Sequence, residues 1–137
     1  MIIGSISENK NIEKRISLVP EIIKKYISNG FEVILEEGIG SHIGFGDNMF
    51  KELGCKLDNK ENVLKNADIL LQVNFPDESN FDKFKGNNIL IGNFNVSQNI
   101  ENIKKLDLNK TSVFSMELLP RITRAQSMDI LSSQANL

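Results

Sequence analysis

Asp68-Ile69-Leu70-Leu71-Gln72-Val73 is the stretch that decides the fold class of this 137-residue chain. It is nearly all apolar, and it lacks the alternation of a strand that has one face in water. A second run, Asn88-Ile89-Leu90-Ile91-Gly92, has the same texture. Such runs are typical of strands that are buried on both faces of a parallel sheet. The sequence therefore predicts a parallel sheet that contains both segments.

Other strand-like and helix-like segments alternate along the rest of the chain. Residues 1–7, 31–35, 55–57 and 112–115 have strand character. Residues 20–29 and 47–53 have helical spacing, and two more helices are expected to start at a capping box of Asp58 and Glu61 and at a Ser97 cap. Short connections between alternating elements favour right-handed crossovers. We expect one doubly wound α/β domain over residues 1–137, flavodoxin-like or Rossmann-like, with a mainly parallel sheet and helices on both faces.

Composition and charge exclude several classes of function. The chain has 16 Lys and Arg against 18 Asp and Glu, a net charge of −2 with His neutral. That balance offers no basic field for nucleic acid or anionic lipid. No apolar run approaches the roughly 20 residues of a membrane span, so we expect a cytoplasmic chain without direct membrane insertion. The single Cys55 is expected to be a buried thiol rather than a nucleophile.

A glycine-rich loop follows the predicted strand at residues 31–35. Its sequence, Gly38-Ile39-Gly40-Ser41-His42-Ile43-Gly44, lies where a dinucleotide fingerprint would, but Ile43 stands where the fingerprint requires glycine. We interpret it as a connecting loop in preference to a phosphate site. His42 is the only histidine, and without a cluster of ligands around it we expect a surface residue and no metal site.

Arg15 lies near the carboxyl end of the first predicted strand. Open α/β sheets bind their ligands at that edge, and a guanidinium can hold a carboxylate or phosphate with two parallel hydrogen bonds. A surface ion pair with a neighbour such as Glu13 explains the same residues equally well. The sequence leaves both interpretations of Arg15 open.

The last polar segment carries the strongest functional signal. Residues 116–136 read MELLPRITRAQSMDILSSQAN, with two Arg, two Gln, one Asp and three Ser in one stretch. If residues from Gln126 onward are helical, Gln126, Asp129 and Ser132 share one side of the helix. These groups can bind a polar ligand, but they contain no nucleophile and base pair. A polar helix start with Glu117 paired to Arg121 or Arg124 is the alternative.

This run resembles the signature of the alpha subunit of proton-translocating NAD(P) transhydrogenase. The opening run EKRISLVPE at residues 13–21 is similar to the start that this subunit shares with alanine dehydrogenase. Val19 departs from both, because they usually have a helix-capping Thr there. Alanine dehydrogenases lack the 116–136 signature and use a Lys and a His where this chain has Gln72 and Asn95. Neither amide can act as an acid or a base near neutral pH.

The resemblance implies an enzyme domain that binds NAD(H) and passes hydride to NADP⁺ bound on a partner domain. Carried over from the family, Arg121 contacts the nicotinamide-side phosphate or ribose. Gln126 lies where the two nicotinamides meet, and Asp129 with Ser132 holds the carboxamide. Arg15 matches a substrate-binding arginine of alanine dehydrogenase and is kept as a possible anion site. The cofactor performs the chemistry, so the protein has to align two rings and exclude water.

The resemblance also implies partners and a missing part. In the family the NAD-binding fingerprint belongs to a second, Rossmann-type domain, and this chain stops at Leu137 before it. We expect a truncated product, a fragment or one piece of a split subunit. The implied partners are the NADP-binding and membrane-embedded transhydrogenase subunits, with a homodimer of the alpha subunit at the inner membrane. Two other interpretations stay open: a fragment of an alanine-dehydrogenase-like oxidoreductase, and a non-catalytic remnant that serves as an interaction module.

Overall fold

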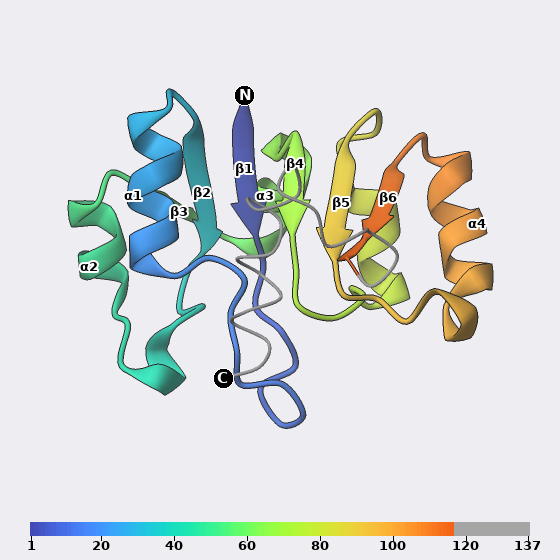
Figure 1. Cartoon of the computed structure of the whole chain (residues 1–137), viewed down its shortest axis with the longest axis horizontal. Coiled ribbons are helices and arrows are strands. Elements are labelled where there is room, and N and C mark those ends of the chain that lie inside the picture. The colour runs from blue at the N-terminus through green and yellow to red at the C-terminus, as the bar shows by residue number, and fades with distance from the viewer. Residues whose placement is uncertain (117–137) are drawn as a thin grey trace.

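The computed structural model describes residues 1–116, and these residues form a parallel sheet of six strands (Figure 1). The strand order is β3-β2-β1-β4-β5-β6. The strands are β1 (Ile2–Ser5), β2 (Glu32–Glu36), β3 (Lys56–Asp58), β4 (Ile69–Leu71), β5 (Ile89–Gly92) and β6 (Ser112–Ser115). Every neighbouring pair is parallel, which confirms the predicted α/β class.

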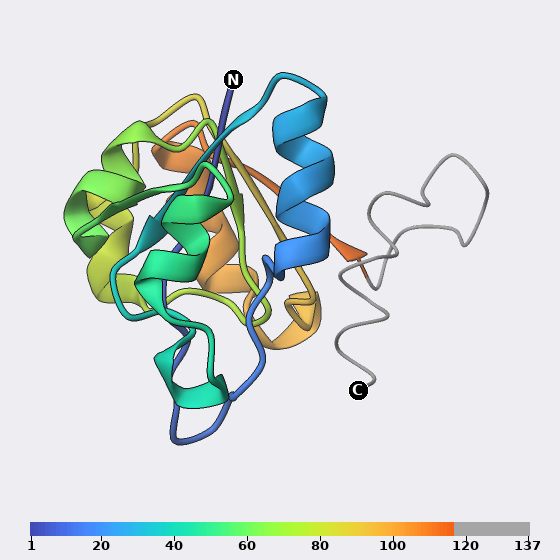
Figure 2. The same ribbon diagram turned by 90° about the vertical axis from the view of Figure 1, so that its left-hand side faces the viewer.

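Helices cover both faces of the sheet, as the doubly wound prediction requires. The α-helices are α1 (Pro20–Ser28), α2 (Asp47–Glu52), α3 (Lys60–Asn66) and α4 (Ile100–Leu108), with short 3-10 helices η1 (Ser41–Ile43), η2 (Glu78–Lys83) and η3 (Val96–Gln98). One buried cluster joins α1 and α2 to the sheet, and a second joins α3, η2 and α4 to the opposite face. Figure 2 shows α1 on one side of the sheet and α3 with η2 on the other.

Alternate residues of each central strand belong to the two clusters. Val33 and Leu35 of β2 pack with α1, whereas Ile34 between them packs with α3. In β4, Leu70 and Leu71 divide in the same way. Because side chains alternate across a strand, a sheet covered on both faces needs apolar residues at successive positions. This explains the unbroken apolar runs of the sequence.

The ends of several elements differ from the sequence predictions. The cap of α3 is Asn59, whose side chain accepts the Asn62 N–H at 2.9 Å, and the predicted cap Asp58 is the last residue of β3. Ser97 does not cap α4, because it lies inside η3 and the helix begins after Asn99 without a side-chain cap. Residues that can cap a helix occur one or two positions apart in both segments. The local sequence therefore does not fix the first residue of each helix, and tertiary packing selects it.

Val19 precedes α1 and makes no side-chain cap, as expected for an apolar residue at a position where the relatives usually have Thr. The N-terminal end of that helix is instead formed by Pro20 at the first helical position, where its missing N–H leaves no donor unpaired. Within residues 1–116, no helix has the length and apolar character needed to cross a bilayer.

Candidate functional site

The strand order reverses between β1 and β4, which lie side by side in the middle of the sheet. The chain leaves β1 toward β2 on one side and leaves β4 toward β5 on the other. The loops that follow the two strands therefore separate at their carboxyl ends. Such a switch point is where open α/β sheets bind ligands. The segments that surround it are residues 6–19 and 72–77.

Glu8 joins the two loops through its carboxylate. Its Oε2 accepts the Val73 N–H at 2.9 Å and the Gln72 Nε2–H at 2.7 Å, and its Oε1 accepts the Asn74 N–H at 3.1 Å. Burial raises the pKa of the Glu8 carboxyl to about 7. The three hydrogen bonds act in the opposite direction and lower the pKa, because they stabilise the ionised carboxylate. The nearby Glu13 carboxylate adds to the rise. Glu8 is thus a carboxyl group at the switch point that exchanges its proton near neutral pH.

Gln72 lies 1% exposed beneath Glu8, and both ends of its amide are engaged. Its Oε1 accepts the Ile6 N–H at 2.8 Å and lies 3.1 Å from the Ser5 hydroxyl. Its Nε2 donates to the Ile6 carbonyl at 3.1 Å and to Glu8. The Ser17 hydroxyl extends the network by donating to the Leu71 carbonyl at 2.6 Å. This network ties both loops to β1 and β4, so Gln72 has a structural role here.

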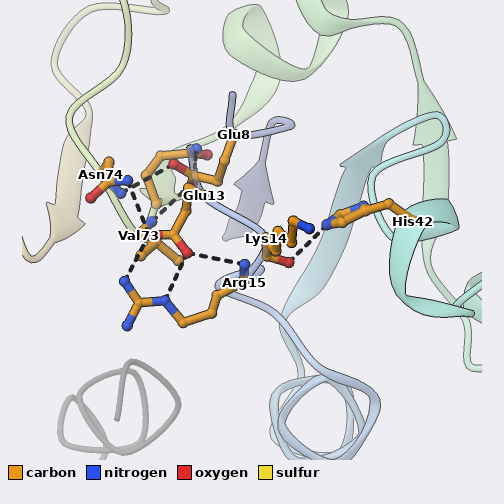
Figure 3. Close-up of polar contacts among 8 residues, drawn as sticks. Glu8, Glu13, Lys14, Arg15, His42, Val73 and Asn74 are labelled. Carbon is orange, nitrogen blue, oxygen red and sulfur yellow. Dashed lines mark hydrogen bonds and ion pairs between the residues drawn. The ribbon is translucent and has the colours of Figure 1, made fainter. Parts of the chain in front are cut away.

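Glu13 and Arg15 form a two-pronged ion pair at the outer side of the same edge (Figure 3). Glu13 Oε1 accepts the Arg15 Nε–H at 2.7 Å, and Oε2 accepts Nη2–H at 2.7 Å. Oε2 also accepts the side-chain amide of Asn74 at 3.1 Å. The Arg15 guanidinium holds the pKa of the Glu13 carboxyl below its usual range, and Glu13 raises that of Arg15. Asn74 therefore bridges two carboxyl groups: its backbone N–H donates to Glu8, and its side-chain amide donates to Glu13.

The structure places Arg15 at the edge where the sequence predicted it, and pairs it with Glu13. The other predicted site residues are Arg121, Gln126, Asp129 and Ser132, and all four lie outside the described residues. Sequence reasoning missed Glu8 and Asn74. A signal was present, because both residues closely follow strands at their carboxyl ends, but the adjacency of β1 and β4 cannot be read from a sequence.

The glycine-rich loop between β2 and α2 is a connection, as expected. Asp47 Oδ1 accepts the Gly38 N–H at 2.9 Å, so a carboxylate binds the amide that a phosphate would need. The helix after the loop, α2, has six residues. A dinucleotide phosphate does not fit this loop. His42 is exposed, and its Nε2 donates to the Lys14 carbonyl at 2.7 Å.

Cys55 is buried, and burial raises the pKa of its thiol to about 11, which leaves it protonated and unreactive at neutral pH. In the described part of the chain, no three His, Cys, Asp or Glu residues come together as a metal site would require.

Comparison with known proteins shows the family of this chain, which the geometry of the site alone does not. The family model described as "Alanine dehydrogenase/PNT, N-terminal domain" matches residues 4–137. The chain belongs to this family. It is 34% identical over 137 residues to the NAD(P) transhydrogenase subunit alpha of Haemophilus influenzae, which covers all of this chain and 27% of that protein.

Solved structures agree with the family assignment. A transhydrogenase from Sinorhizobium meliloti superimposes with a TM-score of 0.88 at 34% identity, over 99% of this chain and 41% of that one. An L-alanine dehydrogenase shares the fold with a TM-score of 0.77 at 21% identity, over 84% of this chain and 32% of that one. This member of the family therefore spans between a quarter and a half of the length of these relatives.

Proposed function

We propose that the chain is the first domain of the NAD(H)-binding alpha subunit of an NAD(P) transhydrogenase. The observation that carries the proposal is the 34% identity to such a subunit along the whole chain. The match to the S. meliloti transhydrogenase at a TM-score of 0.88 supports it. In this proposal the domain positions the nicotinamide of NADH for hydride transfer to NADP⁺ on a partner subunit. Membrane-embedded partners couple the transfer to proton movement and hold the domain at the membrane, and the alpha subunits form a homodimer.

The proposed cofactor contacts come from the 116–136 segment. Arg121 would contact the nicotinamide-side phosphate or ribose, Gln126 would lie between the two rings, and Asp129 with Ser132 would hold the carboxamide. NADH supplies the hydride when it is bound. The residues of this chain have to bind, orient the ring and exclude water.

The described edge of the sheet supports a binding role. The amide of Gln72 is hydrogen-bonded at both ends and cannot take or give a proton near neutral pH. Transfer between two nicotinamides needs no acid or base from the protein, whereas amino-acid dehydrogenation does. The Glu13–Arg15 pair is an additional group at the same edge that could meet the polar part of a ligand.

The isolated chain should bind NADH weakly or not at all. The loop between β2 and α2 does not fit a dinucleotide phosphate, because Asp47 occupies the Gly38 amide. A second domain has to supply that half of a two-walled cleft. Calorimetric titration of the isolated chain with NADH tests this expectation, and micromolar affinity would overturn it.

Substitutions in a completed complex test the proposed contacts. With a Rossmann-type domain and an NADP-binding partner supplied, Arg121→Ala and Asp129→Ala should each lower hydride transfer by about 5- to 150-fold, equivalent to about 1–3 kcal/mol. Lys104→Ala, at an exposed position of α4, is the matched control and should leave the rate unchanged.

Two outcomes would replace the proposal. Full hydride transfer in both variants would favour a non-catalytic remnant that acts as an interaction module. Reductive amination of pyruvate by the completed protein would favour an alanine-dehydrogenase-like oxidoreductase, the other activity named in the family description.

A further inference from the structure

A cavity of about 350 Å³ opens beside the switch point, on the side of α3 and η2. The loop after β1, the loop after β4, the first residue of α3 and a residue of η2 line it. Glu8 and Asn74 belong to this cavity as well as to the polar network, but neither Glu13 nor Arg15 lines it. Residues 38–46 do not reach it either. The cavity therefore lies at the same edge of the sheet as Arg15, but the Glu13–Arg15 pair is not part of its lining.

Asn80 in η2 is the unusual residue of this cavity. It is 8% exposed, and its backbone N–H donates to the Asp77 carbonyl at 3.0 Å. Its side-chain amide, in contrast, has no hydrogen-bond partner among residues 1–116. A buried amide without a partner costs stability, so buried polar groups are almost always paired. The Asn80 amide therefore has a donor and an acceptor, beside the cavity, that residues 1–116 leave open.

Another buried asparagine shows the ordinary case. Asn88 is 3% exposed, and its Oδ1 accepts the Thr111 hydroxyl at 2.6 Å. The two asparagines have the same side chain and similar burial, but Asn88 finds its partner inside the protein. The difference at Asn80 is thus a property of its place beside the cavity.

The rest of the lining indicates the charge and shape of the molecule. Lys60 and Asp77 offer one positive and one negative group, and these nearly cancel. Burial raises the pKa of Glu8 to about 7, so at or below neutral pH much of that carboxyl is uncharged as well. Phe75 adds an aromatic ring, which packs edge-on against Phe94 with 5.1 Å between ring centres. An uncharged molecule with a flat apolar body suits these groups better than an anion.

We propose that this cavity binds a small uncharged aromatic molecule whose edge presents a hydrogen-bond donor beside an acceptor, and that the Asn80 amide recognises that edge. A side-chain amide pairs with such an edge through two hydrogen bonds, as it does with adenine. Nucleobases and aromatic carboxamides both carry it. This proposal rests on the cavity and on Asn80 and not on the proposed transhydrogenase function, so either can fail without the other.

Titrations with matched pairs of small molecules test the site and separate the two sources. Adenosine is compared with purine riboside, which lacks the 6-amino donor, and benzamide is compared with benzoate, which lacks the donor and carries a charge. The readouts are the side-chain NH₂ resonances of Asn80 in NMR spectra of the full chain, together with the dissociation constant. We expect adenosine or benzamide to shift these resonances with a dissociation constant near or below about 1 mM, and its matched analogue to bind about tenfold more weakly.

The Asn80→Leu variant separates binding from structure. Leucine has a similar size and removes the unpartnered amide, so the melting temperature should stay equal or rise while binding falls about tenfold or more. Asn88→Leu is the control, because it breaks an existing buried hydrogen bond. We expect it to lower the melting temperature by about 4 °C or more and to leave binding at the cavity intact.

The proposal is overturned if neither adenosine nor benzamide shifts the Asn80 resonances, which would leave ordered water as the partner of the amide. Equal binding of each molecule and its matched analogue would also overturn it. A fall in the melting temperature of Asn80→Leu as large as that of Asn88→Leu would show that the amide has a partner within the protein, and would overturn it too.

Discussion

Replacing Glu8 by Gln should remove most of the pH dependence of stability between pH 4.5 and pH 7. Burial raises the pKa of the Glu8 carboxyl from 4.5 to about 7. The folded protein therefore holds this proton more tightly than the unfolded chain does. The stabilising effect is complete below pH 4.5, declines as the pH rises through 7, and is absent above that range.

The size of the effect follows from the two pKa values. Each pKa unit corresponds to about 1.4 kcal/mol, so the change from 4.5 to about 7 corresponds to about 3 kcal/mol. Glu13 and Asp68 act in the opposite direction, since their pKa values are lowered by Arg15 and Lys85, respectively. Their contributions are lost only as the pH falls below the usual range for carboxyl groups. The interval from pH 5 to 8 therefore isolates Glu8.

Urea denaturation at pH 5, 6, 7 and 8 measures the prediction, with the wild type and Glu8→Gln compared at each pH. The wild type should lose about 2.5 kcal/mol across this interval, most of the total change, and the variant much less. Glu52→Gln, at an exposed position of α2, is the control and should run parallel to the wild type. Parallel curves for the wild type and Glu8→Gln would refute the reasoning. A wild-type slope of opposite sign would show that the three N–H donors outweigh burial.

Two further predictions concern packing and the thiol. In Gly4→Ala the added Cβ would lie 2.8 Å from the Cβ of Ala67, where α3 meets β1, and we expect about 1–3 kcal/mol of destabilisation in urea. Gly46→Ala, where the added Cβ meets no atom within 4 Å, should be near neutral, and equal losses in the two variants would contradict the packing argument. Because burial raises the pKa of Cys55 to about 11, its reaction with a disulfide reagent at pH 8 should be about 100-fold slower in the native protein than in urea. Equal rates would mean that the thiol is accessible.

Much of the fold was predictable because its signals are local. Successive apolar residues in β4 and β5 follow from burial on both faces, and Pro20 marks the start of α1. The segment 78–83 was not predicted as an element, since a 3-10 helix of this length has no helical periodicity to detect. The Asn59 cap of α3 and the start of α4 after Asn99 were also missed, because neighbouring polar residues compete for these positions.

The candidate site was predictable only in part. Arg15 could be placed near the end of the first strand, but the sequence could not choose between an anion and an ion pair, and the structure shows the pair with Glu13. Gln72 was identified by its departure from the alanine dehydrogenases, but its hydrogen bonds to Ile6 and Glu8 come from more than 60 residues away. No local pattern reports such contacts.

The sequence by itself determined the strands and most of the α-helices, that the strands form a parallel α/β sheet, and, through the runs at residues 13–21 and 116–136, which family the chain resembles. Tertiary structure alone decided that β1 and β4 are neighbours, that Glu8 is half-buried between their loops, and that the side-chain amide of Asn80 has no partner among residues 1–116. The physical reason is the sequence separation of the residues that interact. Burial and backbone preferences act on adjacent residues and leave a pattern in the sequence, whereas a pKa or an unpaired amide depends on which distant segments meet.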